Sequence, residues 1–245
     1  MLRLAWPLFQ ETLLRCLPLG VVAAAASAVP QAESVARRAQ GLAPHDAQWW
    51  GVLAASTALV LICYEGVLRL QWASATRQPC GVMAALRLAV ASLPGAFALV
   101  VLALTPLLPA MLWISGRGFG LLGVLLVLGG LTGVLFVFFG WPAMLAERLS
   151  PWAALRRSTG LVRARFAQVA ALAGLLVAMV MVFAMLTGIF IGEIMMLAGP
   201  AAQSSHVWLS LSRWLMAGVL ALPILYGSAV AVTAFRLATV STRMP

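Results

Sequence analysis

The sequence predicts an all-α fold, a polytopic transmembrane helical bundle of about six spans with short interfacial amphipathic helices. Apolar residues of the AVILMFWYC set make up 63% of the 245 residues, and 9% are charged. A soluble domain is roughly 25% charged. The apolar residues also fall in blocks of about 20, the length that crosses a hydrocarbon core of about 30 Å. The chain from residue 1 to 245 is therefore expected to form a single integral membrane domain.

The expected spans follow from where the apolar blocks begin and end. Each predicted span boundary is accurate to within about four residues. Eight of the nine tryptophans lie near these boundaries, where aromatic residues gather at the membrane surface. The fifth block is longer than a span requires, so that helix is tilted or begins in the interface. The spans are about 13 to 30, 49 to 68, 92 to 114, 119 to 143, 166 to 196 and 208 to 235.

The basic residues predict how the chain is oriented. All sixteen are arginine and give a formal charge of +10. Twelve lie on the side of the termini, and the other side has Arg37, Arg38, Arg117 and Arg213. By the positive-inside rule both termini are cytoplasmic, and this explains the charge better than a nucleic-acid partner does. The absence of lysine and the abundance of Ala, Gly and Leu are typical of a GC-rich bacterial genome, so we expect the bacterial cytoplasmic (inner) membrane.

An alternative concerns the first span. Arg15, an apolar run and then Ala26-Ser27-Ala28 resemble a signal peptide with a small-residue cleavage site. Against cleavage, the region before the apolar run is long and contains Glu11, and removal would leave an odd number of spans. An intact-mass measurement distinguishes a retained first span from one cleaved near Ala28.

A coarse internal repeat is visible. Leu14-Arg15, Leu86-Arg87 and Val162-Arg163 each end a short amphipathic stretch before an apolar block, with arginine spacings of 72 and 76 residues. The pattern predicts up to three copies of one unit, an interfacial helix followed by a transmembrane hairpin. Chance similarity is the alternative.

The segment before the fifth block predicts a basic interfacial helix. Ser150 and Pro151 are an N-cap and a first helical residue. At about 100° per residue the apolar side chains fall within about 80° of arc, and Leu161 lies outside it. The predicted apolar face is Trp152, Leu155, Thr159, Val162 and Phe166. The candidate lipid-binding or partner-binding residues are Arg148, Arg156, Arg157, Arg163 and Arg165. Either they recognise anionic headgroups or a protein, or they only enforce topology.

The same segment resembles a known family. The run from Glu147 through Ala153-Ala154-Leu155, Arg157-Ser158 and Leu161-Val162-Arg163 is similar to a signature of YciC-like bacterial inner-membrane proteins. A similar signature occurs in the membrane domain of some glycerophosphodiester phosphodiesterases. The resemblance covers most of the chain in layout and about 20 residues in motif, and implies six spans with the N-terminus inside. Phosphodiesterase chemistry belongs to a separate soluble domain in those proteins, so the resemblance implies no catalytic residue here.

Few residues have the character of a catalytic or metal site. The six acids are scattered from Glu11 to Glu193 and the two histidines are far apart, so we expect no catalytic residue and no enzyme activity. His45 and Asp46 have no companion ligands, and the spacing of Cys16, Cys63 and Cys80 indicates neither a disulfide framework nor a metal motif. No cofactor or metal is expected.

Three features within the spans remain. Glu65 and Arg69 stand four residues apart with the acid first, which predicts an intramembrane ion pair. Pro94, Pro106 and Pro109 interrupt span three, beside Thr105, and either kink it for packing or mark a transporter site. Two Gly-xxx-Gly motifs begin at Gly129 and Gly188 and permit close helix contacts, within the chain or between subunits.

The sequence therefore favours a non-catalytic membrane protein that organises lipids or partner proteins through a basic cytoplasmic face. The alternative is a small-molecule transporter or channel, or the membrane subunit of a transport complex. Expected partners are the lipid bilayer with its anionic lipids, and either partner proteins or further copies of the chain, with no nucleic acid.

Overall fold

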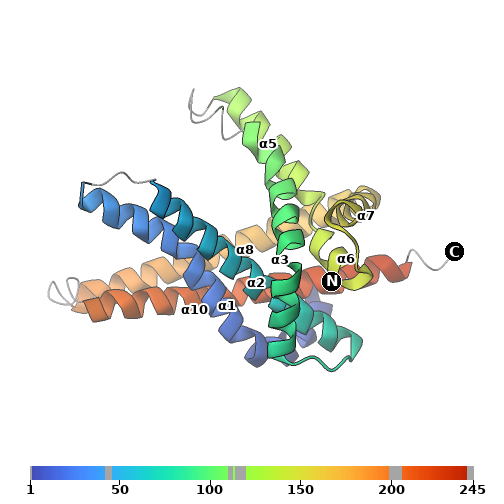
Figure 1. The fold of residues 1–245 in the computed structure, drawn as a ribbon, viewed down its shortest axis with the longest axis horizontal. Coiled ribbons are helices and arrows are strands. Elements are labelled where there is room, and N and C mark those ends of the chain that lie inside the picture. The colour runs from blue at the N-terminus through green and yellow to red at the C-terminus, as the bar shows by residue number, and fades with distance from the viewer. Residues whose placement is uncertain (1, 42–45, 110–112, 114–119, 199–205, 242–245) are drawn as a thin grey trace. The chain divides into compact units, whose positions relative to one another are not determined.

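The computed structural model describes residues 2–41, 46–109, 113, 120–198 and 206–241. These residues form helices and turns with no strand, so the predicted all-α class is confirmed (Figure 1). The elements are α1 (Leu2–Ala39), α2 (Ala47–Thr76), α3 (Val82–Leu104), η1 (Thr105–Leu107), α5 (Leu121–Leu135), α6 (Gly140–Glu147), α7 (Pro151–Ala164), α8 (Phe166–Ala198) and α10 (His206–Ser241).

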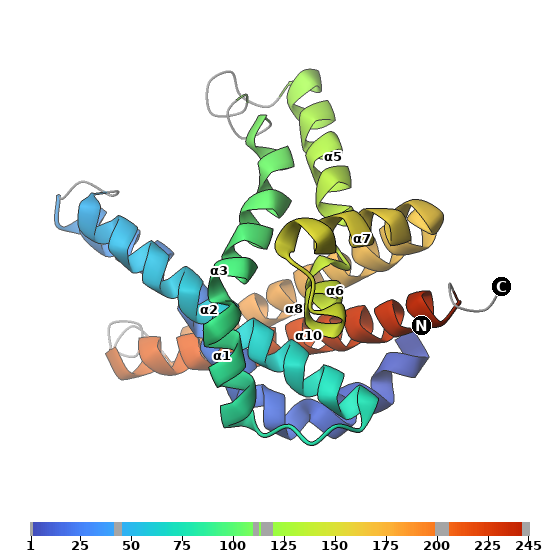
Figure 2. The ribbon, with the colours of Figure 1, turned by 45° about the vertical axis from the view of Figure 1, so that its right-hand side comes forward.

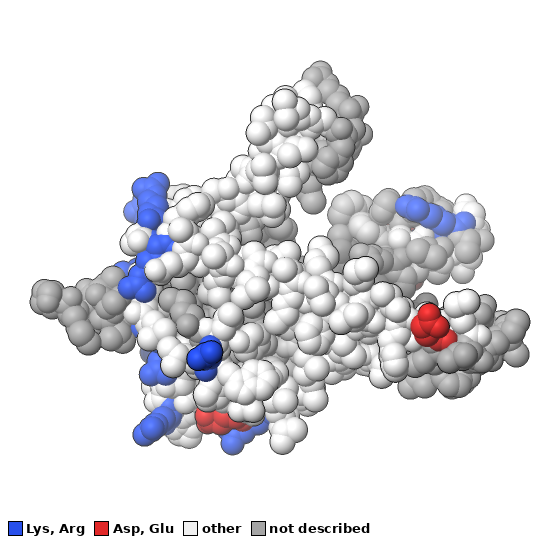
Figure 3. All heavy atoms as spheres, turned by 180° about the vertical axis from the view of Figure 1, so that it is seen from behind, with Lys and Arg blue, Asp and Glu red and all other residues white. Residues whose placement is uncertain are grey.

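Six helical stretches of the described residues are long and apolar enough to cross a membrane. They are Leu2–Arg38, Ala47–Thr76, Val82–Leu104, Leu121–Glu147, Phe166–Phe190 and Trp214–Thr239. Their exposed side chains are largely apolar, and the face in Figure 3 carries charge at few places. The chain is a multi-pass membrane protein.

The helices differ from the expected spans at their ends. α3 begins at Val82, whereas the third apolar block was expected to begin near residue 92. The later part of that block falls on 110–112 and 114, outside the described residues. The end of a helix is set by its backbone cap and not by hydropathy. α2 continues past its apolar block and ends at Thr76, because the next residue, Arg77, has a left-handed φ of 56°.

The expected repeat of interfacial helix and hairpin is only partly present. In the third copy α7 is a separate helix, followed by α8 from Phe166. In the first two copies the amphipathic stretch is continuous with the span, in α1 and α3. α1 bends along its length (Figure 2) and contains Pro7, Pro18 and Pro30, each of which removes a backbone hydrogen bond.

The chain divides into two compact units, Met1–Val90 with Leu176–Val230, and Ala91–Leu175 with Ala231–Pro245. α3, α8 and α10 each contribute residues to both. In the first unit α1 and α2 form a hairpin whose helices lie side by side (Figures 1 and 2).

Glycine contacts in the first unit bring α1 against α10. A Cβ added at Gly20 would lie 3.1 Å from Cγ of Leu225 and 3.2 Å from Cβ of Ala221. Small residues of this kind let membrane helices approach closely. By contrast, a Cβ at Gly129, or at Gly188 in α8, would meet no atom within 4 Å, so these two glycines of the predicted motifs make no close helix contact among the described residues.

Candidate functional site

The candidate site is α7, which joins two spans. The stretch Leu121–Glu147 precedes it and Phe166–Phe190 follows it. Because a connection between consecutive spans cannot cross the hydrocarbon core again, residues 148–165 lie at one membrane surface. All five predicted binding arginines lie in this connection.

Local sequence determines where α7 begins. α6 ends at Arg148, whose left-handed φ of 51° and ψ of 40° turn the chain out of the helix. Ser150 is then the N-cap of α7, and its side chain accepts a hydrogen bond of 3.4 Å from the Ala153 N–H. Pro151, the first helical residue, has no N–H to leave unpaired. The predicted start of this helix is therefore correct.

One face of α7 is buried within the second unit, to which the helix belongs. Ala154, Ser158 and Val162 are fully buried, and Leu161 is 5% exposed. The Ser158 Oγ accepts a hydrogen bond of 3.0 Å from the Phe139 N–H, in the turn before α6. These four residues lie within about 100° of arc, as expected for one helix face.

The predicted apolar face coincides only in part with the face that is buried in the protein. Trp152 is 54% exposed and Phe166 is 41% exposed, whereas Leu161, which the prediction left out, is buried. The reason is packing: the small side chains of Ala154 and Ser158 allow the backbone of α7 to come close to its neighbours, whereas the large ring of Trp152 lies on the other side of the helix.

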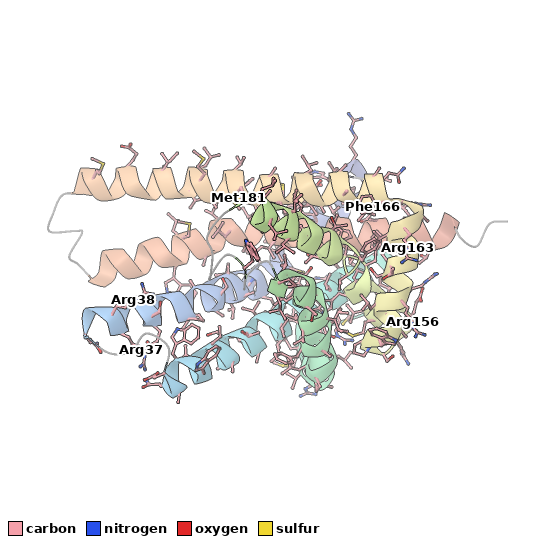
Figure 4. The ribbon with its side chains drawn as sticks, turned by 90° about the horizontal axis from the view of Figure 1, so that it is seen from above. Arg37, Arg38, Arg156, Arg163, Phe166 and Met181 are labelled. Carbon is pink, nitrogen blue, oxygen red and sulfur yellow. The ribbon has the colours of Figure 1, made fainter. Side chains whose placement is uncertain are left out.

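The opposite face of α7 is formed by Trp152, Arg156 and Arg163, which we call the outer stripe. All three are exposed. At about 100° per residue they lie within about 40° of arc, centred about 150° from the buried face. The guanidinium carbon of Arg156 lies 5.6 Å from the centroid of the Trp152 ring, a cation–π distance. Figure 4 shows Arg156 and Arg163 along the helix.

The other three predicted arginines have different surroundings. Nε of Arg157 lies 3.2 Å from Oε1 of Glu147, so this ion pair closes the α6–α7 hairpin. Arg148 is exposed at the end of α6. The backbone N–H of Arg165 bonds the Val162 carbonyl oxygen at 3.0 Å and ends α7. Of the five arginines, Arg156 and Arg163 alone belong to the outer stripe.

The predicted intramembrane ion pair of Glu65 and Arg69 lies in α2, in the first unit. Nη2 of Arg69 lies 2.6 Å from Oε1 of Glu65. The Glu65 side chain is fully buried, and that of Arg69 is 21% exposed. Both residues belong to the candidate span Ala47–Thr76, which is the environment that the spacing predicted for them.

The α1–α2 connection carries a charged cluster that was not predicted from the sequence. Nε of Arg37 lies 2.8 Å from Oε1 of Glu33, and Nη1 donates to Oδ2 of Asp46. Arg37, labelled in Figure 4, is 5% exposed. The Glu33–Arg37 spacing and an Asp before an apolar run were signals available in the sequence.

Asp46 in this cluster is the N-cap of α2. The Trp49 N–H donates to its carboxylate at 2.9 Å, and this bond, followed by the Arg37 side chain, lowers the pKa of Asp46 below its ordinary value of 3.8. Nε1 of Trp49 also donates to the Pro30 carbonyl oxygen at 3.0 Å. His45, considered with Asp46 as a metal ligand, lies outside the described residues.

Within the part of the chain that the structure describes, no three His, Cys, Asp or Glu side chains gather closely enough to hold a metal ion. No family model, curated protein or solved structure matches the chain. The geometry of α7 is therefore the main structural guide to what this chain does.

Proposed function

We propose that this chain is a non-catalytic protein of the bacterial inner membrane, with cytoplasmic termini, that organises lipids or partner proteins through a basic cytoplasmic face. That face is the α7 connection with Arg148, Arg156, Arg157, Arg163 and Arg165. The observation that carries the proposal is the outer stripe, because it presents two arginines and an exposed tryptophan on the side of α7 that does not pack against protein.

The charge distribution supports the orientation. The six spans put the two termini, the α2–α3 connection and the α7 connection on one side, with 12 of the 16 arginines. Five of those 12 lie between α6 and α8. Arginine-rich short connections remain on the cytoplasmic side during insertion.

The packing of α7 supports membership of the YciC-like family. Several residues that carry the resemblance hold α7 in place: Glu147 pairs with Arg157, and Ala154, Ser158, Leu161 and Val162 form the buried face. These members of the signature are packing residues, whereas Arg163, which also belongs to it, lies on the outer stripe.

Purification in mild detergent tests the proposed function. Arg148, Arg156 and Arg163 are replaced together by Gln, and Arg157 is kept because Glu147 needs it. We expect the wild-type chain to co-purify with anionic lipid or with a defined protein, and the triple variant to lose that component while eluting at the same volume. Equal recovery of every lipid and protein by the two chains would contradict the proposal.

A second candidate is a small-molecule transporter or channel, or the membrane subunit of a transport complex. It is favoured by the interruption of the third span, where α3 ends at Leu104 and η1 follows with a proline in its first turn. Thr105 bonds the Val101 carbonyl oxygen at 2.7 Å, and Pro94 lies inside α3. Broken membrane helices line substrate sites in transporters. Solute-specific flux into liposomes containing the purified chain would favour this candidate over the first.

A further inference from the structure

We infer that the outer stripe of α7 binds the headgroup phosphates of anionic phospholipids in the leaflet beside it. This inference rests on the proposed function and names its ligand. It also divides the arginines by role, because Arg156 and Arg163 contact lipid whereas Arg157 holds the α6–α7 hairpin together.

The position of the stripe is the first argument. α7 lies at a membrane surface because it connects two spans, and its Ala154–Val162 face is buried within the second unit. The stripe lies about 150° around the helix from that face. It therefore faces the bilayer surface or the aqueous phase.

Trp152 favours the bilayer surface. Trp152 is 54% exposed, and it could join the buried face only if α7 rotated about its axis. An exposed indole is unfavourable in water, but tryptophan is enriched at the headgroup level, where its ring is partly in hydrocarbon and its N–H reaches polar groups. Because α7 lies at the membrane surface, Trp152 is placed where a tryptophan ring meets lipid headgroups.

The charge of the outer stripe also favours anionic phospholipid. α7 contains no acidic residue, and the nearest acid in sequence, Glu147, pairs with Arg157. Within the described residues neither Arg156 nor Arg163 makes an ion pair. A guanidinium offers paired donors that match phosphate oxygens, and its aliphatic stem lies along apolar surface while the head reaches the phosphate. The stripe is therefore complementary to anionic phospholipid.

Lipid retention tests this inference directly. The chain is equilibrated with equal amounts of phosphatidylglycerol and phosphatidylcholine in mixed micelles, and retained lipids are counted by native mass spectrometry. Each arginine near an anionic headgroup contributes about five-fold in affinity, so R156Q/R163Q should reduce the preference for phosphatidylglycerol about 30-fold. The matched control is R3Q/R15Q, which removes the same charge from two exposed positions of α1 and should lose less of the preference, because neither residue belongs to the outer stripe.

Three further measurements exclude trivial results. The thermal unfolding midpoint of R156Q/R163Q should equal that of wild type, because neither side chain is buried. Phosphatidylglycerol with brominated chains should quench the fluorescence of wild-type protein more than that of W152F. Inorganic phosphate added to the micelles should not displace phosphatidylglycerol, because free phosphate lacks the acyl chains that hold lipid beside Trp152.

The outcomes separate this inference from the proposed function. An unchanged lipid preference in R156Q/R163Q, an equal loss in R3Q/R15Q, or displacement by free phosphate would each overturn the lipid site. If the preference is unchanged but a co-purifying protein is lost, the inference fails and the proposed function survives. If R156Q/R163Q loses more of the lipid preference than R3Q/R15Q does, both are supported.

Discussion

The buried hydroxyl of Ser158 accepts a hydrogen bond of 3.0 Å from the backbone N–H of Phe139, 19 residues earlier in the chain. Phe139 lies in the turn between α5 and α6, and its side chain is also buried. The bond therefore fixes the rotation of α7 about its own axis, which determines that the outer stripe faces away from the protein.

Replacing Ser158 by Ala should destabilise the second unit. The Phe139 N–H would lose its acceptor in a buried place, which costs about 1–3 kcal/mol. The measurement is the free energy of unfolding in detergent by denaturant titration. T159A is the matched control, since Thr159 Oγ1 bonds only the Leu155 carbonyl oxygen of its own helix, at 2.8 Å, and should change stability by less than about 0.5 kcal/mol. Equal losses in the two variants would contradict this role for Ser158.

Gly20 should tolerate no larger side chain. In G20V the new atoms would start 3.1 Å from Cγ of Leu225, and α1 would have to move away from α10, at about 1–3 kcal/mol. G218A is the control in α10, because the new Cβ would meet no atom within 4 Å. This substitution should raise the free energy of unfolding by up to about 1 kcal/mol, since Ala favours a helix more than Gly does. The same unfolding titration measures both. Stability of G20V at the wild-type level would show that α1 and α10 do not pack in this way.

The six spans could be predicted because membrane thickness requires long apolar helices, and that property belongs to each segment alone. The Glu65–Arg69 pair could be predicted for a similar reason, since both members lie on one helix four residues apart. The Ser150 cap is also local, and the sequence identified it.

The parts that could not be predicted depend on distant residues. The rotation of α7 follows from Phe139, and the separation of Arg157 from Arg156 follows from Glu147, ten residues before Arg157 and on another helix. Amphipathicity weighs only the apolar character of side chains, so it grouped Trp152 with Val162 on one apolar face. Close packing selected Ala154 and Ser158 instead.

The α1–α2 connection should loosen at low pH. Because the folded chain lowers the pKa of Asp46 below 3.8, the ionised form is favoured by folding. Its contribution is fully present above pH 3.8 and is lost as the pH falls through the lower, folded value. Hydrogen exchange at the Trp49 amide, which donates to Asp46, measures the loss.

D46N provides the comparison for this pH effect. The amide oxygen can still accept from the Trp49 N–H, but the charge opposite Arg37 is gone. Exchange at Trp49 should then be faster at neutral pH and should lack the acid transition of wild type. The same acid transition in D46N would assign the effect to another group, such as Glu33.

Gln71 should be replaceable by Leu. Its Nε2 donates to the Leu225 carbonyl oxygen at 3.0 Å, but its buried Oε1 has no hydrogen-bond partner among the described residues. In Q71L the Leu225 carbonyl oxygen would still accept the hydrogen bond of 2.8 Å from the Ser228 hydroxyl. Q71L should therefore unfold within about 1 kcal/mol of wild type, whereas Q71A leaves a cavity and should cost about 2 kcal/mol or more. Equal losses in both variants would mean that the bond to Leu225 is essential.

The Glu65–Arg69 pair should be costly to break and inexpensive to remove. E65Q leaves Arg69 without its carboxylate in a span, and loss of one partner of a buried pair costs about 3–5 kcal/mol. Since the Arg69 side chain is 21% exposed, we expect the lower end of that range. In E65L/R69L no charge remains to be stabilised, so the free energy of unfolding in detergent should return most of the way to wild type. If the double variant is as unstable as E65Q, the pair contributes through packing or through other partners, and the ion pair does not account for the stability of α2.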